Sequence, residues 1–202
     1  MEAVKGPFKT LKNIILASGS PRRQMLLTQL GIYFQVMVSN EKEKSEADRP
    51  EVLVIENAEA KAENIFKTKV RGVIIAADTA VVLNGAILGK PKDKEDAIST
   101  LKKLSGKWHE VYTGCFIIDN TSDNVHSEKF VVKSEVFVDK FPTNIIKKYV
   151  ETKEPLDKAG SYAIQGIGSF FIKEIRGSYS NVIGLPINEL VKHLLRISAI
   201  GV

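Results

Sequence analysis

Runs of apolar residues alternate along the chain with segments in which apolar residues recur every three or four positions. The runs are typical of buried strands, at Ile14–Leu16, Ile32–Ser39, Val73–Ala77, Trp108–Ile118, Val125–Asp139 and Ser169–Ile175. The spaced segments follow a capping residue or a proline and predict helices that begin at Ser20, Pro50, Asp93, Pro142 and Pro186. Strands and helices alternate at first and strands then predominate, which predicts an α/β fold with a mixed sheet.

A tight hairpin is predicted after the strand that begins at Val73. The pair Asn84-Gly85 is a strong signal for a type I′ turn. Such a turn places Leu83 opposite Ala86, and the same register, continued along the strands, places Thr79 opposite Lys90.

Asp78 interrupts the apolar run of this strand, and an acid in that position needs a partner if it is buried. Strict alternation would send Asp78 and Lys90 to opposite faces of the sheet. Gly89 and Pro91 flank the lysine and allow a bulge or a strand end that would turn it round. The sequence leaves both arrangements open, and a turn-capping role for Asp78 is the plain alternative.

Composition places the chain among ordinary globular proteins. Of its 202 residues, 44% are hydrophobic and 26% are charged, and the net charge of +5 suits an anionic small molecule as well as nucleic acid. Residues 1–12 are expected to form a flexible leader and residues 13–202 a single domain. Cys115 stands alone in an apolar run, so it is expected to be buried, in a protein of the reducing cytoplasm. No apolar run approaches the length of a membrane span.

The stretch from Ile14 to Leu27 carries the clearest chemical signal. A short strand leads through small residues into a helix whose first turn contains Arg22 and Arg23. Cations at a helix start are unfavourable, because the helix dipole already makes that end positive. Two arginines beside free backbone N–H groups therefore predict an anion site, and phosphate suits it best. The alternative is that both arginines are simply solvated.

Further charged residues lie beside predicted turns and helix starts. Lys61 has no acidic residue three or four positions away on its helix, so its charge must meet water or an anion. Glu43 belongs to the highly charged stretch 40–49, where solvation is the ordinary interpretation. Together with the arginines, Lys90 and Asp78, these residues are a set that phosphoryl chemistry uses: cations hold phosphates, and carboxylates recruit Mg²⁺ or Mn²⁺ and activate water. No P-loop, dinucleotide fingerprint or nucleophile elbow is present.

Six motifs carry a resemblance that spans nearly the whole chain beyond residue 12. In chain order they are ILASGSPRR, AADT, LGKP, LSG, ETKEPLDKAGSYAIQG and GLPI. In these motifs the chain resembles the Maf-like nucleoside triphosphate pyrophosphatases. The resemblance implies two lobes around a central cleft, in a mixed twisted sheet with flanking helices similar to that of the inosine triphosphate pyrophosphatases. It also implies hydrolysis of a nucleoside triphosphate to the monophosphate and pyrophosphate with Mg²⁺ or Mn²⁺, and a part in removing non-canonical nucleotides.

The resemblance also assigns roles, residue by residue. Matches to the phosphate-holding positions are Ser18, Arg22, Arg23, Lys61 and Lys90. Asp78 matches the proton acceptor and a metal-binding position, and Glu43 matches the acid near the metal. Lys42 stands beside Glu43 where the family usually has an acid, so the chain departs from the family pattern next to this metal position.

The positions that match those tied to substrate choice are Arg22, Thr79 and Gln165. Arginines directly after Pro21 and a glutamine in the IQG segment resemble the branch that hydrolyses dTTP and UTP. A glutamine amide both donates and accepts, which matches N3–H and a ring carbonyl of uracil or thymine. The alternatives are that Gln165 only stabilises its loop, that the enzyme is specific for 7-methyl-GTP, or that the protein binds nucleotide or RNA without catalysis. Relatives suggest a homodimer, and neither a membrane nor a stable nucleic-acid partner is expected.

Overall fold

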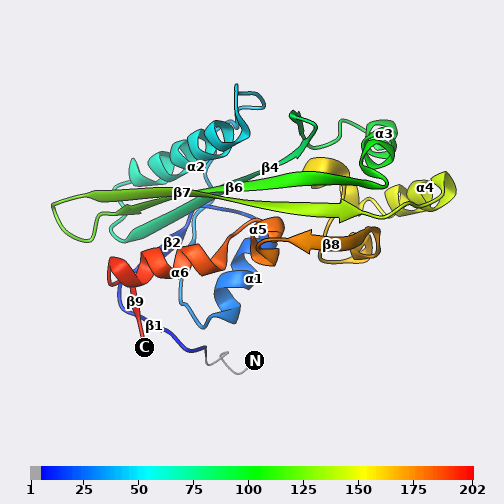
Figure 1. Ribbon diagram of the computed structural model, residues 1–202. Helices are drawn as coiled ribbons and strands as arrows, with labels where there is room; N and C mark the ends of the chain where they lie inside the picture. The colour runs from blue at the N-terminus through cyan, green and yellow to red at the C-terminus, as the bar shows by residue number, and fades with distance from the viewer. Residues whose placement is uncertain (1–5) are drawn as a thin grey trace.

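The computed structural model describes residues 6–202 and shows a seven-stranded mixed sheet flanked by helices (Figure 1). The strand order is β3-β2-β4-β6-β7-β8, and β5 pairs with β4. The strands are β2 (Ile14–Leu16), β3 (Gln35–Val36), β4 (Val73–Leu83), β5 (Ala86–Leu88), β6 (Lys107–Asp119), β7 (His126–Val138) and β8 (Ile172–Arg176). β2 runs parallel to β3 and β4, and the other pairs are antiparallel.

Helices cover both faces of the sheet. They are α1 (Pro21–Gln29), α2 (Pro50–Phe66), α3 (Lys94–Leu104), α4 (Thr143–Glu151), α5 (Tyr179–Ile183) and α6 (Ile187–Arg196). In β2 and β4, alternate apolar residues point to opposite faces: Ile15 and Ile74 pack under α2, whereas Leu16 and Ile75 pack with α1 and α6. No helix among residues 6–202 is long and apolar enough to pass through a membrane.

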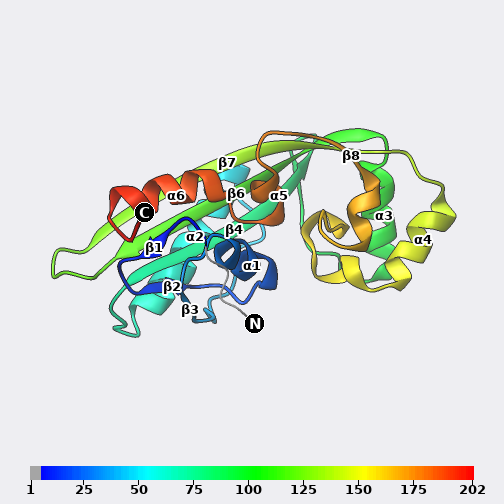
Figure 2. The ribbon, with the colours of Figure 1, turned by 90° about the horizontal axis from the view of Figure 1, so that it is seen from below.

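The long strands β6 and β7 join two lobes (Figure 2). One lobe surrounds the parallel part of the sheet. In the other, α3 and α4 pack with three short 3₁₀ helices, η1 (Glu154–Asp157), η2 (Ala159–Ser161) and η3 (Ile167–Phe171). The larger hydrophobic cluster runs through both lobes, from Leu27 and Leu190 to Leu101 and Val150. The α/β fold with a mixed sheet is thus confirmed, as is the burial of Cys115.

Most predicted elements form where the apolar pattern placed them, and the differences lie in short segments. The strand predicted at Ile32–Ser39 is reduced to Gln35–Val36, and the one predicted from Ser169 begins at Ile172, after η3. The helix α5 was not predicted; at five residues it is too short for a periodic pattern to show.

Part of the expected flexible leader is structured. Lys9–Thr10 forms β1, which pairs with β9 (Ile200–Gly201) near the C-terminus. The ammonium of Lys12 also lies 2.6 Å from the carboxylate of Asp119. The expectation of a loose segment is therefore wrong for residues 9–12, whose partners are distant in sequence; residues 1–5 lie outside the described part of the chain.

A buried histidine links the two lobes. Nε2 of His109, on β6, lies 2.8 Å from the hydroxyl of Tyr162, while its Nδ1 has no partner among residues 6–202. Burial lowers the pKa of His109 from 6.5 to about 4. Between these values the unfolded chain binds a proton that the folded chain does not, so acid favours unfolding.

We expect His109 alone to remove up to about 3 kcal/mol of folding free energy as the pH falls from 6.5 to 4. Above pH 6.5 the histidine is neutral in both the folded and the unfolded chain, so it removes no folding free energy there. The variant His109→Gln leaves a neutral partner for Tyr162 and should lose this part of the pH dependence. Urea unfolding of both proteins at pH 7 and pH 4.5 measures it, and the same pH dependence in both would contradict the assignment.

Candidate active site

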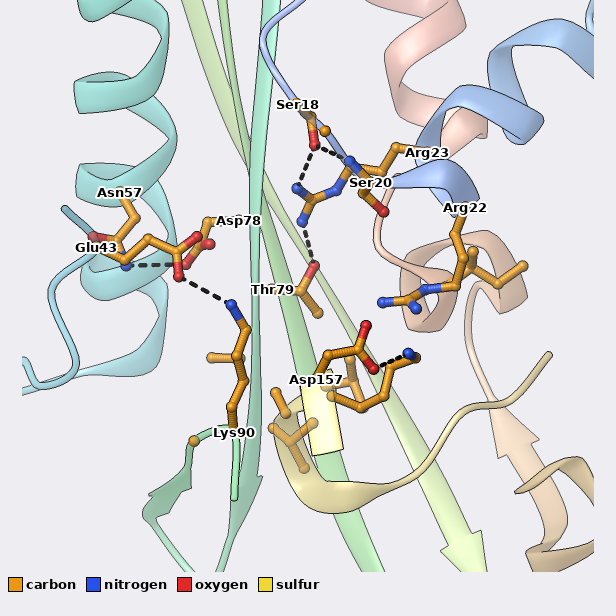
Figure 3. A pocket seen from close by; sticks show the side chains of 18 of the residues that line it. Ser18, Ser20, Arg22, Arg23, Glu43, Asn57, Asp78, Thr79, Lys90 and Asp157 are labelled. Atoms are coloured by element: carbon orange, nitrogen blue, oxygen red, sulfur yellow. Dashed lines mark hydrogen bonds and ion pairs between the residues drawn. The ribbon is translucent and has the colours of Figure 1, made fainter. Parts of the chain in front are cut away.

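A cleft of about 590 Å³ opens between the two lobes, beside the middle of β4. Eight of the nine residues predicted for the site line it: Ser18, Arg22, Arg23, Glu43, Lys61, Asp78, Thr79 and Lys90. They come from five separate segments of the chain, and Figure 3 shows most of them around the same opening. The ninth, Gln165, is half-buried and does not line the cleft, although its neighbours Ala163 and Ile164 do.

Asp78 and Thr79 are consecutive residues of β4, so their side chains leave the strand on opposite sides (Figure 3). Asp78 faces α2, and its cross-strand partner on β6 is Gly114. A Cβ at Gly114 would lie 2.7 Å from the backbone of Val54. The glycine therefore lets α2 approach the sheet, and this approach brings the helix onto Asp78.

Two side chains of α2, one helical turn apart, hold the Asp78 carboxylate. Nζ of Lys61 lies 2.7 Å from Oδ1, and Nδ2 of Asn57 donates to Oδ2 at 3.0 Å. All three residues are buried, with 8% or less of their surface exposed. The lysine without an acidic neighbour on its own helix thus pairs with a carboxylate from β4.

Glu43 joins this group from the charged stretch 40–49. Its Oε1 lies 2.6 Å from Nζ of Lys61, and its Oε2 lies 3.5 Å from Nζ of Lys90. Burial acts to raise the pKa of Glu43, but its hydrogen bonds and ion pairs with Lys61 and Lys90 hold that pKa below the usual value. Glu43 is therefore an anion placed between two cations, although 43% of its side chain remains exposed to solvent.

Lys90 lies on the same side of β4 as Asp78, and its ammonium contacts Glu43 (Figure 3). The predicted turn is confirmed, since Leu83 pairs with Ala86. The predicted pairing of Thr79 with Lys90 is wrong, because β5 ends at Leu88 and the chain leaves the sheet there. Strict alternation consequently does not apply to the lysine.

Arg23 organises the other side of the cleft. Its guanidinium donates to Oγ of Ser18 at 3.1 Å, to Oγ1 of Thr79 at 3.2 Å and to the carbonyl oxygen of Gly184 at 2.7 Å. Burial lowers the pKa of Arg23, and the negative charge of Asp78 opposes that shift. The arginine is held in a fixed orientation between α1, β4 and the end of α5.

Arg22 differs from Arg23, although both lie in the first turn of α1. It lines the cleft, but its side chain has no hydrogen bond or ion pair with any other residue in the range 6–202. Ser20 is the N-cap residue, as predicted, but its side chain makes no capping hydrogen bond, and no acid lies in the first turn. This helix start therefore offers a cation that has no close ion-pair partner among residues 6–202, together with free N–H groups, to an anion.

Asn57 is a site residue that the sequence analysis missed. Besides its bond to Asp78, its amide exchanges two hydrogen bonds with the backbone of Lys44, at 2.8 Å and 3.0 Å. It thereby attaches the stretch that carries Glu43 to α2. The available signal was a polar residue next to Ala58 on the buried face of the helix, four positions before Lys61.

Glu43 and Asp78 fit a divalent cation only in part. Both carboxylates contact the same ammonium, so this point of the cleft already favours positive charge. Among residues 6–202 no group of three or more His, Cys, Asp or Glu side chains is arranged to hold a metal. Mg²⁺ commonly takes one or two carboxylates and completes its oxygen shell with water and substrate phosphate, which two carboxylates beside a phosphate site would allow.

The family model and the sequence relatives point to the same family. A family model described as "Maf-like protein" matches residues 13–197. The dTTP/UTP pyrophosphatase of Nitratidesulfovibrio vulgaris (strain Hildenborough) is 43% identical over 199 residues, 96% of this chain and 92% of that protein. The dTTP/UTP pyrophosphatase of Clostridium botulinum (strain Alaska E43) is 48% identical over 180 residues, which cover 88% of this chain and 95% of that protein. A dITP/XTP pyrophosphatase structure from Mycobacterium abscessus aligns over 93% of this chain and 97% of its own, with a TM-score of 0.43 and 15% identity.

Proposed function

This chain belongs to the Maf-like protein family, and from that membership we propose that it hydrolyses dTTP and UTP to the nucleoside monophosphate and pyrophosphate. The observation that carries the proposal is the pair of carboxylates, Asp78 and Glu43, set among the cations of the cleft. A protein that only bound phosphate, without a metal, would gain nothing from two anions beside its ligand. A hydrolase can use such carboxylates to accept a proton from water and to hold a divalent cation.

In the proposed mechanism the cations of the cleft take the triphosphate. Arg22 and the start of α1 meet its negative oxygens, and Lys61 and Lys90 exchange their carboxylate partners for phosphate oxygens. Asp78, freed from Lys61, accepts a proton from a water molecule that attacks the α-phosphorus. The bond from that phosphorus to the bridging oxygen breaks, and pyrophosphate leaves.

A divalent cation, Mg²⁺ or Mn²⁺, would be held by Glu43 and Asp78 with phosphate oxygens and would supply neutralisation of the phosphate charge. Hydrogen bonds to Ser18, Thr79 and Gly184 fix the orientation of Arg23. Its guanidinium group is therefore already in position when the substrate binds. The cytoplasm as compartment and a homodimer as assembly stay predictions from the sequence.

Product identification tests the proposal. The protein is incubated with a panel of triphosphates and Mg²⁺, and the products are separated. Nucleoside monophosphate with pyrophosphate is the expected result. A diphosphate with orthophosphate would refute the bond assignment, and the absence of any turnover would favour a binding protein.

The base preference is proposed to depend on Gln165. The relatives named dTTP/UTP pyrophosphatases support this choice of substrate, and the glutamine amide complements the pyrimidine edge. The residue follows Ala163 and Ile164, which line the cleft, so its backbone lies next to the cleft wall. In the proposal a rotation of the Gln165 side chain, with the backbone in place, brings the amide to a bound base.

The variant Gln165→Glu is expected to lower kcat/KM for dTTP and UTP by about tenfold or more, because an ionised carboxylate accepts but does not donate. Thermal stability should change little. The measurement is kcat/KM for dTTP, UTP, ATP, GTP and 7-methyl-GTP, with Gln29→Glu at the exposed end of α1 as control. A wild-type preference for 7-methyl-GTP would contradict the assignment.

A further inference from the structure

Two acceptor groups of the lobe that contains α3 and α4 bind the segment that carries Gln165, one on each side of this residue. On the near side, N–H of Ala163 donates to the hydroxyl oxygen of Tyr149 at 3.2 Å. On the far side, the carboxylate of Glu154 accepts from N–H of Ile167 at 2.9 Å and of Gly168 at 2.8 Å. Gln165 thus lies between two anchors that are two residues away on either side.

Both anchors are themselves fixed. Tyr149, on α4, is buried at 3% exposure, and its ring packs edge-to-face on Phe171 with centroids 5.0 Å apart. Glu154 is the first residue of η1, and each of its two carboxylate oxygens accepts from one N–H at the start of η3, which ties the two short helices together. Burial and the nearby Glu154 carboxylate raise the pKa of Tyr149, so its hydroxyl stays protonated.

Gly166 shows how closely the segment is drawn onto Glu154. Its φ of 109° is unfavourable for any residue with a side chain, and a Cβ there would lie 2.2 Å from Oε1 of Glu154. The residue directly after Gln165 therefore has its backbone pressed against the anchor. A displacement of Glu154 must move this backbone, and the position of the Gln165 side chain moves with it.

We propose that Tyr149 and Glu154 are positioning residues for base selection: they hold the backbone around Gln165 so that its amide meets a pyrimidine base in the cleft. This inference rests on the proposed function, in which Gln165 selects the base. Neither residue lines the cleft, so neither contacts the triphosphate. Their loss should change which base is accepted while leaving phosphate binding and the chemical step in place.

The test compares the wild type with Glu154→Ala and Tyr149→Phe. The first removes both acceptors of the far anchor, and the second removes one hydroxyl and keeps the ring packing. The ratio of kcat/KM for dTTP to kcat/KM for ATP is expected to fall about tenfold in Glu154→Ala and several-fold in Tyr149→Phe, because small displacements of a selecting group have effects of this size. Turnover of ATP should stay within about threefold of the wild type. Amide exchange at Ile167 and Gly168 should become faster in Glu154→Ala.

The matched control is Glu151→Ala, which removes an exposed carboxylate of α4 whose partner is Lys148. It should leave the ratio unchanged. Two results with a dTTP-preferring wild type would overturn the inference and leave the proposed function standing. In the first, both anchor variants keep the preference for dTTP. In the second, both variants lose the dTTP and ATP activities together, in parallel with a fall in melting temperature. A wild type without a pyrimidine preference would refute the proposed base selection, and this inference with it.

Discussion

Replacing Asp78 by asparagine is expected to lower kcat by roughly 10²–10⁴, the usual contribution of a general base. The amide has the size of the carboxylate and can still accept from Asn57, but it has no charge with which to take a proton from water. Lys61 keeps Glu43 as its partner, so the cluster should persist. Nucleotide affinity should stay within a few-fold of the wild type. Single-turnover rates with dTTP and binding measured by calorimetry separate the two effects.

Asp123→Asn is the matched control for this change. That residue lies on the loop between β6 and β7, with 98% of its side chain exposed and its carboxylate paired with Arg71. The control should keep full turnover. Near-normal kcat in Asp78→Asn would show that another group is the base.

Replacing Arg23 by alanine is expected to raise KM for dTTP by roughly 10- to 150-fold, which corresponds to about 1.5–3 kcal/mol for a lost charge-assisted contact. It should also destabilise the fold, because the carbonyl of Gly184 and the hydroxyls of Ser18 and Thr79 lose their donor. The sequence gives a different expectation, since removing a cation from a helix start should spare the fold. The three hydrogen bonds of Arg23 predict the opposite outcome.

Arg22→Ala is the informative comparison, because Arg22 has no such contacts within residues 6–202. It should weaken dTTP binding by a similar factor with stability unchanged or slightly raised, as the cation at the start of α1 is removed. Steady-state kinetics and thermal unfolding of both variants distinguish the roles. Arg176→Ala, which removes an arginine stacked on Trp108 outside the cleft, serves as control. Equal stability loss in the two cleft variants would contradict the account.

The sequence was sufficient to predict the fold class and most of the long elements. Apolar runs and caps mark where a strand or helix begins, and Asp93 caps α3 through the N–H of Asp96, as the pattern indicated. The geometry of the site was harder to predict from the sequence, because it depends on which strands lie side by side. The approach of α2 to Asp78 depends on Gly114, which is thirty-six positions further along the chain and adjacent only through the sheet.

The segments that differ from prediction are held by contacts that no periodic pattern records. η3 occupies the start of a predicted strand because Glu154 accepts two of its amides, from thirteen and fourteen positions away. The face on which Lys90 lies was undecided in the sequence, since both a continued strand and a strand end suited it. The carboxylate of Glu43 shows which arrangement is adopted.

The most direct test of the central claim is hydrolysis of dTTP in water enriched in oxygen-18. Attack of the water held beside Asp78 on the α-phosphorus puts the heavy oxygen into the monophosphate, and mass spectrometry of the two products locates it. The account predicts labelled dTMP and unlabelled pyrophosphate. Label in pyrophosphate, or in orthophosphate released with dTDP, would contradict it.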